Sequence, residues 1–300
     1  MKNFLGALLT LAALSFAQHA AALDVFTCEP EWGALVQELG GDKVSVYVAT
    51  SALQDPHRIQ AKPSLLARAR RAQLVVCTGA ELEIGWLPIV LRQSGNSAVQ
   101  PDKPGYFEAA NYVQRLEVPT RLDRAAGDVH AGGNPHIQTD PRNIARVATA
   151  LAQRLGEIDP ANAAYYGARY ADFTKRWDAA LQRWDKQAAP LKGVAIVAHH
   201  RSWVYLNHWL GLREIAELEP KPGVEPTAAH LEEVLAQLKR DPARMVIRSA
   251  YEDGRASEWL AGRAKIPAVM LPFTVGGSDK AKDLFGLYDD TIARLVQALK

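Results

Sequence analysis

Histidine residues lie at widely separated points of this 300-residue chain, in segments that could present them in loops. His57 ends the segment DPH and His136 ends the segment NPH, while His199 and His200 directly follow an apolar run. Neutral imidazole is a suitable ligand for Zn²⁺ at about 2.0–2.1 Å. A proline before a histidine also restricts the backbone that presents it, which reduces the ordering needed on binding. These loops could therefore supply the ligands of one metal ion.

The spacing of these histidines does not by itself establish a metal site. A single loop histidine is more often solvated or hydrogen-bonded than metal-bound, and the separations are too long for a zinc-finger pattern. We interpret His208 and His230, which lie in helical segments, as structural. His130 lies in the glycine-rich segment 125–135, which we expect to be a mobile loop. It is either an auxiliary ligand or no ligand.

The composition sets the broad class of the protein. Hydrophobic residues make up 48% and charged residues 23%, which excludes a disordered, collagen-like or coiled-coil chain. The formal net charge of +2 gives no reason to expect a nucleic acid or a polyanionic partner. The length fits two α/β lobes. Two cysteines are too few for a disulfide-rich mini-domain or a four-cysteine zinc site.

Residues 1–22 have the pattern of a secretory signal peptide. Lys2 gives a positive start, residues 4–17 are largely apolar, and three alanines end the segment at Ala22, near which we expect cleavage. The apolar run is short for a membrane span, and no other segment reaches about 18 apolar residues. We therefore predict a soluble protein that is exported to the periplasm and starts near Leu23.

Export changes the interpretation of the two cysteines. Cys28 follows the strand-like run 23–27, and Cys77 ends the run 74–77. The carboxyl ends of two strands in one parallel sheet could bring the sulfurs within bonding distance, and an oxidising compartment would allow a disulfide. Two buried thiols are the alternative, since free cysteine is common in protein cores. We favour a Cys28–Cys77 disulfide.

Short apolar runs alternate with segments of helical periodicity along the chain, which predicts parallel α/β units. The expected strands are 23–27, 44–49, 74–77, 194–198, 213–218, 244–247 and 268–271. The expected helices are 31–39, 64–71, 143–155, 202–210, 227–238, 254–263 and 281–299, with Thr227 as a possible cap of the fifth. In open sheets of this kind, ligands bind beyond the carboxyl ends of the strands.

One predicted helix is much longer than the others. It follows the helix-start pair Asp159-Pro160, covers residues 161–189, and carries aromatic residues at spacings near 3.6. A helix of roughly 28 residues is about 42 Å long at 1.5 Å per residue. We predict an α/β fold of two lobes, each with a parallel sheet flanked by helices, joined by this long helix. The predicted boundaries are 23–158 for the N-terminal lobe, 159–190 for the joining helix and 191–300 for the C-terminal lobe.

Several short motifs occur in a fixed order along the mature chain. They are GGDKV at 40–44, DPH at 55–57, KPS at 62–64, NPH at 134–136, TDP at 139–141, HRSWVY at 200–205, GL at 211–212 and EPT at 225–227. Together with the long helix, they resemble the bacterial periplasmic metal-binding proteins that supply zinc and manganese ABC importers, the ZnuA/TroA type of cluster A-I solute-binding proteins. The resemblance covers the mature chain from end to end. The position of Tyr205 selects His200 rather than His199 as the family's third histidine.

The resemblance implies three metal ligands, which are His57, His136 and His200. The chain departs from the family at the fourth position. Arg248 stands at the strand end where the family commonly has a glutamate, and arginine cannot bind a cation. The family's last ligand is usually an aspartate after the final strand, and Asp279 is the nearest carboxylate there. We predict Asp279 as the fourth ligand, with Glu252 or a water molecule as alternatives.

The predicted cargo is Zn²⁺. Three imidazoles and one carboxylate favour a tetrahedral zinc site, whereas Mn²⁺ prefers oxygen-rich sites of higher coordination. The resemblance implies a solute-binding protein, not an enzyme, that delivers the ion to the permease of an ABC importer in the inner membrane. We expect a monomer, with a periplasmic metallochaperone as a further partner. Because site histidines must be neutral to bind, affinity should fall below about pH 6.5.

Two other classes of function compete with this prediction. An exported zinc-dependent hydrolase also uses three protein ligands, but it keeps a position for an activated water and needs a general base beside that water. The chain contains neither an HExxH nor a GxSxG motif. An exported adhesin or structural protein would need no metal.

Overall fold

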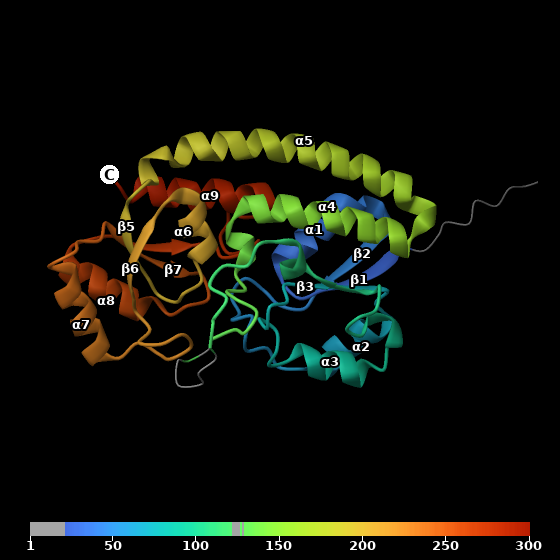
Figure 1. Cartoon of the computed structure of the whole chain (residues 1–300), viewed down its shortest axis with the longest axis horizontal. Helices are drawn as coiled ribbons and strands as arrows, with labels where there is room; N and C mark the ends of the chain where they lie inside the picture. Colours follow the sequence, from blue (N-terminus) through green and yellow to red (C-terminus); the bar gives the residue numbers. More distant parts are fainter. Residues whose placement is uncertain (1–21, 122–126, 128) are drawn as a thin grey trace, which may run out of the picture.

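The computed structural model describes residues 22–121, 127 and 129–300. The predicted signal peptide at 1–22 therefore lies outside the described residues except for its last position, as does much of the first half of the predicted loop at 125–135. In the described part, two α/β lobes lie side by side beneath one long helix (Figure 1). None of the described helices is both long enough and apolar enough to cross a membrane.

The first lobe is built on a four-stranded parallel sheet. Its strands are β1 (Leu23–Thr27), β2 (Val44–Val48), β3 (Leu74–Cys77) and β4 (Tyr106–Glu108), in the spatial order β2-β1-β3-β4. Thr27 is in register with Val48 on one side and with Val76 on the other, so the carboxyl ends of these strands meet at one edge. β3 is buried along its whole length, as expected for a parallel strand that is covered on both faces.

The second lobe repeats this topology. Its strands are β5 (Ala195–Ala198), β6 (Arg213–Glu217), β7 (Met245–Ser249) and β8 (Ala268–Leu271), all parallel, in the order β6-β5-β7-β8. In each sheet the strand order reverses beside the first strand, and such switch points are where ligands bind in open α/β sheets. His199 and His200 directly follow β5 at this point.

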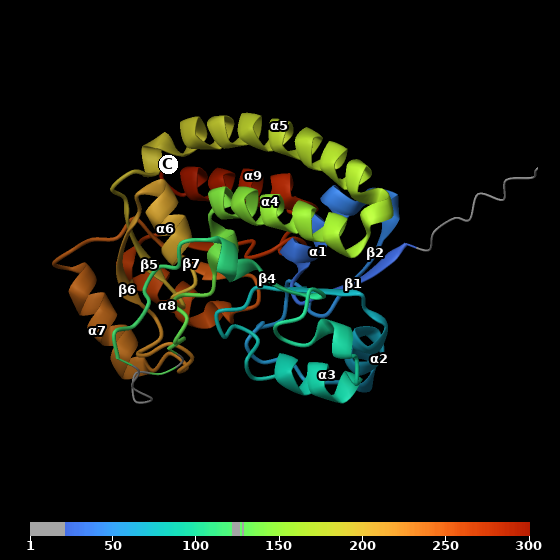
Figure 2. The same cartoon turned by 45° about the vertical axis from the view of Figure 1, so that its right-hand side comes forward.

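Helices cover both faces of the first sheet. α1 (Pro30–Gly40) and α4 (Pro141–Ile158) lie on the face toward the long helix, and α2 (Pro63–Arg71) and α3 (Leu87–Ser94) lie on the other face (Figure 2). All four have a proline in their first turn, where the missing N–H is not needed for a helical hydrogen bond.

The second lobe carries α6 (Val204–Leu210), α7 (Ala228–Leu238) and α8 (Gly254–Ala264). Thr227 caps α7 as predicted, because its Oγ1 accepts a hydrogen bond from the N–H of His230 at 3.3 Å. The last helix, α9 (Leu284–Gln297), starts three residues later than predicted. Asp283 sets this start, since its carboxylate accepts the N–H of Gly286 at 2.7 Å.

The long helix, α5 (Ala163–Ala188), confirms the predicted two-lobe fold with one long helix. It has 26 residues, and short 3₁₀ turns at Pro160–Asn162 and Ala189–Leu191 flank its two ends. α9 runs along α5 (Figures 1 and 2), and the ring of Tyr288 lies 5.1 Å from that of Trp184, centroid to centroid. The lobes are therefore joined by a packed pair of helices.

A continuous apolar core lies beneath these two helices. It includes Val76 of the first sheet, Ile196 of the second sheet and Leu295 of α9. Two smaller cores fill the outer faces of the sheets, one under α2 and α3 and one under α7 and α8. The division of the chain at residues 159 and 190 stays a prediction.

The Cys28–Cys77 disulfide is present, with 4.8 Å between the two Cα atoms, and the prediction is confirmed. The register of the sheet explains it. Thr27 pairs with Val76, so the residues that follow them stand side by side at the carboxyl ends of neighbouring strands. Both cysteines are fully buried.

Candidate metal site

The three predicted histidine ligands lie together between the lobes. One ring nitrogen from each of His57, His136 and His200 lies within 4.8 Å of the other two. The ring centroids are 5.3 Å apart for His57 and His136 and 5.6 Å apart for His136 and His200. His57 follows β2, His136 precedes α4, and His200 follows β5, so the two lobes contribute side chains to one point. Three imidazoles this close could bind one divalent cation.

Each of the three rings is held through its Nδ1 atom by a neighbouring oxygen. Nδ1 of His57 is 2.7 Å from Oδ1 of Asp55, and Nδ1 of His200 is 2.6 Å from Oε2 of Glu219. A carboxylate can only accept, so these Nδ1 atoms carry the proton and Nε2 is left with the lone pair. The Nε2 atoms of His57 and His136 are buried and have no hydrogen-bond partner among the described residues.

The DPH and NPH segments form the same turn. Oδ1 of Asp55 accepts both the N–H of His57, at 3.0 Å, and its ring Nδ1. Oδ1 of Asn134 accepts the N–H of His136 at 3.1 Å and lies 3.0 Å from its Nδ1. The residue two positions before each histidine therefore shapes the turn and orients the ring. In the sequence, the signal for this role is the shared Asx-Pro-His pattern, in which the first residue matters as well as the proline.

Burial and neighbouring charges shift the pKa values of His136 and His200 in opposite directions. Burial, and then the neighbouring imidazoles, hold the pKa of His136 well below its ordinary value, so this ring is neutral. Burial alone would also lower the pKa of His200, but the hydrogen bond and the charge of Glu219 outweigh it and raise that pKa. Burial opposes ionisation of Asp55, yet its contact with His57 lowers the pKa of the carboxyl.

Glu252 is a carboxylate in a cavity beside two of the three rings. It lines a cavity of about 280 Å³ together with Asp55, His57 and His200. Its Oε2 accepts the N–H of Ser249 at 2.6 Å, while its Oε1 is buried with no partner in the described part of the chain. Burial raises the pKa of Glu252 to about 7.

Asp279, the predicted fourth ligand, is not brought to the histidines. Its side chain is exposed, and it lines neither of the cavities beside them. The loop after β8 instead directs Thr274 inward, where its hydroxyl donates to the buried carboxyl of Glu31 at 2.5 Å. Glu252, which the sequence left as an alternative, is one of the carboxylates that line a cavity with His57 and His200, whereas Asp279 as a ligand stays a prediction without support from the geometry.

Arg248, which stands where the family commonly has a glutamate, stabilises the turn after β7. Its Nη1 donates to the main-chain oxygens of Ser249 and Glu252, at 3.3 and 3.1 Å. It thereby holds the turn after β7 that carries Glu252.

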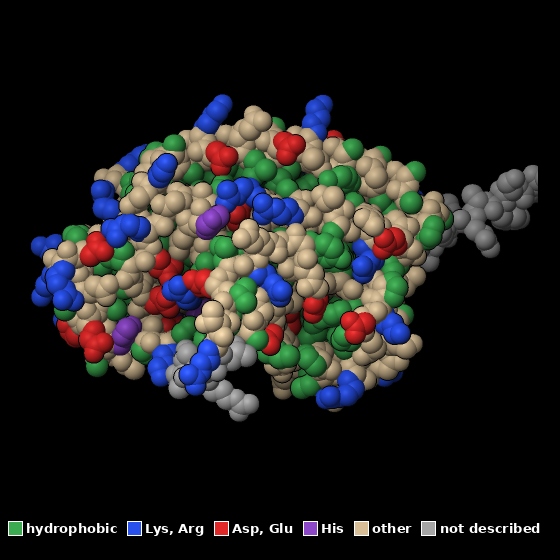
Figure 3. Space-filling model, in the orientation of Figure 1, with side chains coloured by type: hydrophobic (Ala, Val, Ile, Leu, Met, Phe, Trp, Pro, Cys, Tyr) green, Lys and Arg blue, Asp and Glu red, His purple; other side chains and the backbone are tan. Residues whose placement is uncertain are grey.

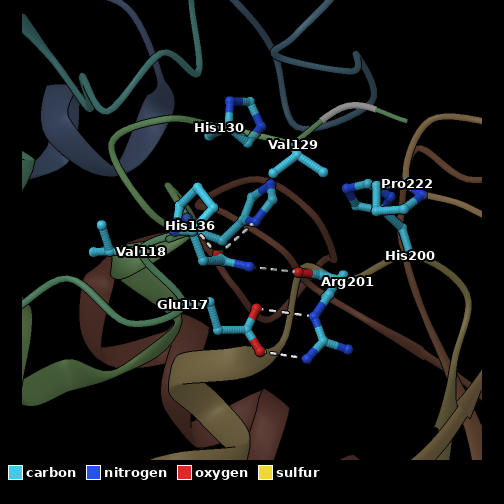
Figure 4. A pocket seen from close by; sticks show the side chains of 10 residues that line it. Glu117, Val118, Val129, His130, His136, His200, Arg201 and Pro222 are labelled. Atoms are coloured by element: carbon cyan, nitrogen blue, oxygen red, sulfur yellow. Dashed lines mark hydrogen bonds and ion pairs between the residues drawn. The ribbon is translucent and has the colours of Figure 1, made fainter. Parts of the chain in front are cut away.

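The other histidines near the site are His130 and His199. His130 stacks on His57 with 5.4 Å between ring centroids, and it lines a second cavity of about 360 Å³ with His136 and His200 (Figure 4). His199 lines the same cavity as Glu252, and burial lowers its pKa. His230 bonds to the main-chain oxygen of Glu217, outside this cluster.

Charged side chains of both signs lie next to each other at the junction of the lobes (Figure 3). The clearest group is formed by Arg201, which pairs with Glu117 and Glu217. Figure 4 shows the Arg201–Glu117 pair beside the cavity that contains His136 and His200.

Comparison with known proteins gives one consistent match. The model of the family described as "Zinc-uptake complex component A periplasmic", ZnuA, matches residues 25–298. A high-affinity zinc uptake system protein ZnuA from Paracoccus denitrificans is 23% identical, over 97% of this chain and 96% of its own length. A manganese ABC transporter substrate-binding lipoprotein PsaA from Streptococcus pneumoniae is 23% identical, over 84% of this chain and 80% of its own length.

Solved structures share the fold. A crystal structure of ZnuA superposes with a TM-score of 0.77 and 24% identity, over 93% of this chain and all of that chain. A mutant structure of the laminin-binding adhesin Lmb from Streptococcus agalactiae also gives a TM-score of 0.77, with 19% identity over 93% of this chain and all of that chain. At these identities the likeness shows the fold alone.

Proposed function

The chain belongs to the ZnuA family, the periplasmic metal-binding components of ABC importers, and on this premise we propose that its cargo is Zn²⁺. The chain takes up the ion in the periplasm and passes it to the permease of its importer. We propose further that it is exported by a signal peptide cleaved near Ala22 and acts as a monomer. The hydrolase alternative gains no support from a family of transport proteins.

The observation that carries the choice of zinc is the set of three imidazoles whose Nδ1 atoms are already held by oxygens. Their Nε2 atoms are left to bind the ion. Three nitrogen ligands with one carboxylate suit tetrahedral zinc, whereas Mn²⁺ and Ca²⁺ favour oxygen-rich sites. The relatives include a manganese ABC transporter protein as well as a zinc uptake protein, and therefore do not select between the two ions. The choice of zinc rests on the ligand atoms of this chain.

We propose Glu252 as the fourth ligand. Its buried Oε1 has no partner among the described residues, and Glu252 lines the cavity that His57 and His200 also line. A carboxyl whose pKa is raised to about 7 by burial gains a strong favourable interaction when a cation arrives and displaces its proton. Ser249 and Arg248 hold the turn that presents it.

The four proposed ligands come from both lobes. His57 and His136 belong to the first, and His200 and Glu252 to the second. Separation of the lobes by a small amount would divide the shell and lower its affinity, which suits a protein that must release its cargo to a permease.

Calorimetric titration of the metal-free protein tests the proposal. We expect one equivalent of Zn²⁺ to bind, with much weaker binding of Mn²⁺, and loss of zinc binding after His57→Ala, His136→Ala or His200→Ala. Retention of one equivalent of zinc in all three variants, or tighter binding of Mn²⁺ than of Zn²⁺ by the unaltered protein, would overturn it.

A further inference from the structure

We propose that Arg201 is a positioning residue that couples contact between the lobes to the orientation of the His136 ring, so that separation of Arg201 from its partners speeds release of the metal. The proposal rests on the proposed function, since it takes His136 as a zinc ligand. Arg201 directly follows His200 in the chain. Its side chain and its main chain reach the two segments that precede His136 (Figure 4).

The Arg201 guanidinium contacts three carboxylates from two parts of the chain, those of Glu117, Glu217 and, at 3.5 Å, Glu214. Nε and Nη2 donate to the two oxygens of Glu117, with 2.9 Å between Nε and Oε2. Nη1 donates to Glu217 of β6 at 2.5 Å. Glu117 lies in the loop that follows β4 of the first lobe. Paired bonds between a guanidinium and a carboxylate fix direction as well as charge, so Arg201 holds this loop against the second lobe.

The main chain of Arg201 acts on the ring of His136 through Asn134. The Asn134 amide donates from Nδ2 to the main-chain oxygen of Arg201 at 2.9 Å. Its oxygen accepts the N–H of His136 and lies 3.0 Å from the ring Nδ1. One planar amide therefore connects the residue next to His200 with the ring of His136. Movement of Arg201 away from Asn134 would remove the bond that fixes the amide plane, and with it the orientation of the ring.

Tyr205 of α6 supports the same connection. Its hydroxyl donates to the main-chain oxygen of Asn134 at 2.7 Å and accepts the N–H of Leu116 at 3.0 Å. Asn134 and Leu116 also bond to each other through their main chains, at 2.9 Å. The segments around residues 116 and 134 thus form one unit, which the second lobe holds through Tyr205 and Arg201.

The backbone of Glu117 shows that this unit is held rather than relaxed. Glu117 has a φ of +52°, a left-handed conformation that is unfavourable for residues other than glycine. Such conformations persist where their surroundings hold them in place and often occur at functional sites. Here the bonds to Arg201 and, through Leu116, to Tyr205 lie directly at the strained residue. Once the Arg201–Glu117 pair separates, relaxation of this backbone favours the separated state.

Stopped-flow measurement of zinc dissociation into excess chelator tests the coupling. The variants are Arg201→Gln, Glu117→Gln and the double variant in the otherwise unaltered chain. Arg213→Gln is the matched control, because Arg213 lies on β6 and pairs with Asp241 on the surface at 3.1 Å. Association rates, zinc stoichiometry and the His136 tautomer by long-range proton–nitrogen NMR complete the set.

We expect each single variant to dissociate zinc about 10-fold faster, the lower end of the range for loss of an outer partner of a metal ligand, because the substitutions free the Arg201 main chain without removing the oxygen that holds Asn134. The association rate should stay within about twofold, because no ligand is removed. The double variant should match Arg201→Gln, because the Arg201–Glu117 pair is already absent in that single variant. Arg201→Lys should restore only part of the effect, because lysine lacks the paired geometry. Arg213→Gln should dissociate zinc as the unaltered chain does.

Unchanged dissociation in Arg201→Gln and Glu117→Gln, in protein that binds one zinc, would overturn the inference and leave the proposed function intact. Equal effects of Arg213→Gln and Arg201→Gln would also overturn it, since they would indicate a general effect of charge. Failure of the unaltered chain to bind zinc would instead remove the proposed function. If Arg201→Gln does not fold, Glu117→Gln decides the question, because that side chain lies in a partly exposed loop.

Discussion

The ring Nδ1 of His57 lies 2.7 Å from a carboxylate oxygen of Asp55, the residue two positions before it. The same oxygen also accepts the main-chain N–H of His57. A single aspartate therefore fixes both the turn and the tautomer, and the same arrangement recurs with Asn134 at His136. Substitution of Asp55 or Asn134 therefore tests whether the orientation of the histidine ring contributes to metal binding.

Asp55→Ala should weaken zinc binding about 10- to 100-fold, because an outer partner that orients a metal-bound histidine contributes that much to affinity. Asp55→Asn should lose less, since its amide oxygen can still accept from the ring and from the main chain. Competition with a chelating dye measures both affinities. Asp178→Asn, on the exposed face of α5, is the control. Equal affinity of Asp55→Ala and the control would contradict the prediction.

Glu252→Gln and Asp279→Asn distinguish the two candidates for the fourth ligand. Loss of the Glu252 carboxylate should lower zinc affinity by at least about tenfold, because a charged ligand is replaced by a neutral one. Asp279→Asn should leave affinity unchanged, since this side chain is exposed and lies outside both cavities. Titration calorimetry at pH 7.5 gives both values. The reverse result would restore Asp279 to the site.

Three buried carboxyls of the first lobe make stability depend on pH. Burial raises the pKa of Glu31 and of Glu83 to about 7 and raises that of Glu29 well above its ordinary value. Between about pH 4.5 and 7 the folded chain holds protons that the unfolded chain has released. These groups therefore make the free energy of unfolding fall as pH rises through this interval.

Glu83→Gln should remove part of this dependence. The free energy of unfolding of the variant minus that of the unaltered chain should be more positive at pH 7.5 than at pH 5. The reason is that the amide, unlike the carboxyl, never ionises in the core. Urea unfolding of the metal-free proteins at both pH values gives the difference, and Glu258→Gln on the exposed side of α8 is the control. A stability difference that is the same at both pH values would show that Glu83 does not contribute to the slope.

The Cys28–Cys77 bond should matter for stability and not for binding. It closes a loop with a sequence separation of 49, for which chain entropy gives about 4 kcal/mol of stabilisation. Cys28→Ala with Cys77→Ala should lower the free energy of unfolding by about this amount, as measured in denaturant. Zinc affinity should stay within about twofold, since neither cysteine lines the cavities beside the three rings. A large loss of zinc affinity in a folded double variant would show that the disulfide also contributes to binding.

The amino-acid sequence is informative where local pattern decides the structure. Predicted strands 23–27, 74–77 and 268–271 coincide with β1, β3 and β8, because each is a short apolar run between polar breaks. The sequence did not reveal β4, which has three residues after a Pro-Gly pair, or α3, whose amphipathic run is only eight residues long. Neither segment is long enough to show a period.

The site divides in the same way. The loops that carry His57, His136 and His200 each leave a mark in the sequence, and the structure brings the three rings together. The position of Glu252 depends on contacts across the turn after β7, where Arg248 bonds to two main-chain oxygens. In the sequence, Arg248 indicates only that a ligand is missing from its position. In the structure, it holds the turn that carries the carboxylate of Glu252. Contacts of this kind have no signature in a single sequence.

The packing of α9 along α5 also bears on how the chain reaches its folded state. Leu23 at the start of β1 and Leu295 near the end of α9 belong to the same apolar core. The first lobe cannot bury α1 completely until the C-terminal helix arrives, because α9 contacts α1 as well as α5. Folding is thus coupled across the whole length of the chain, because a polypeptide without α9 lacks the element that completes its core.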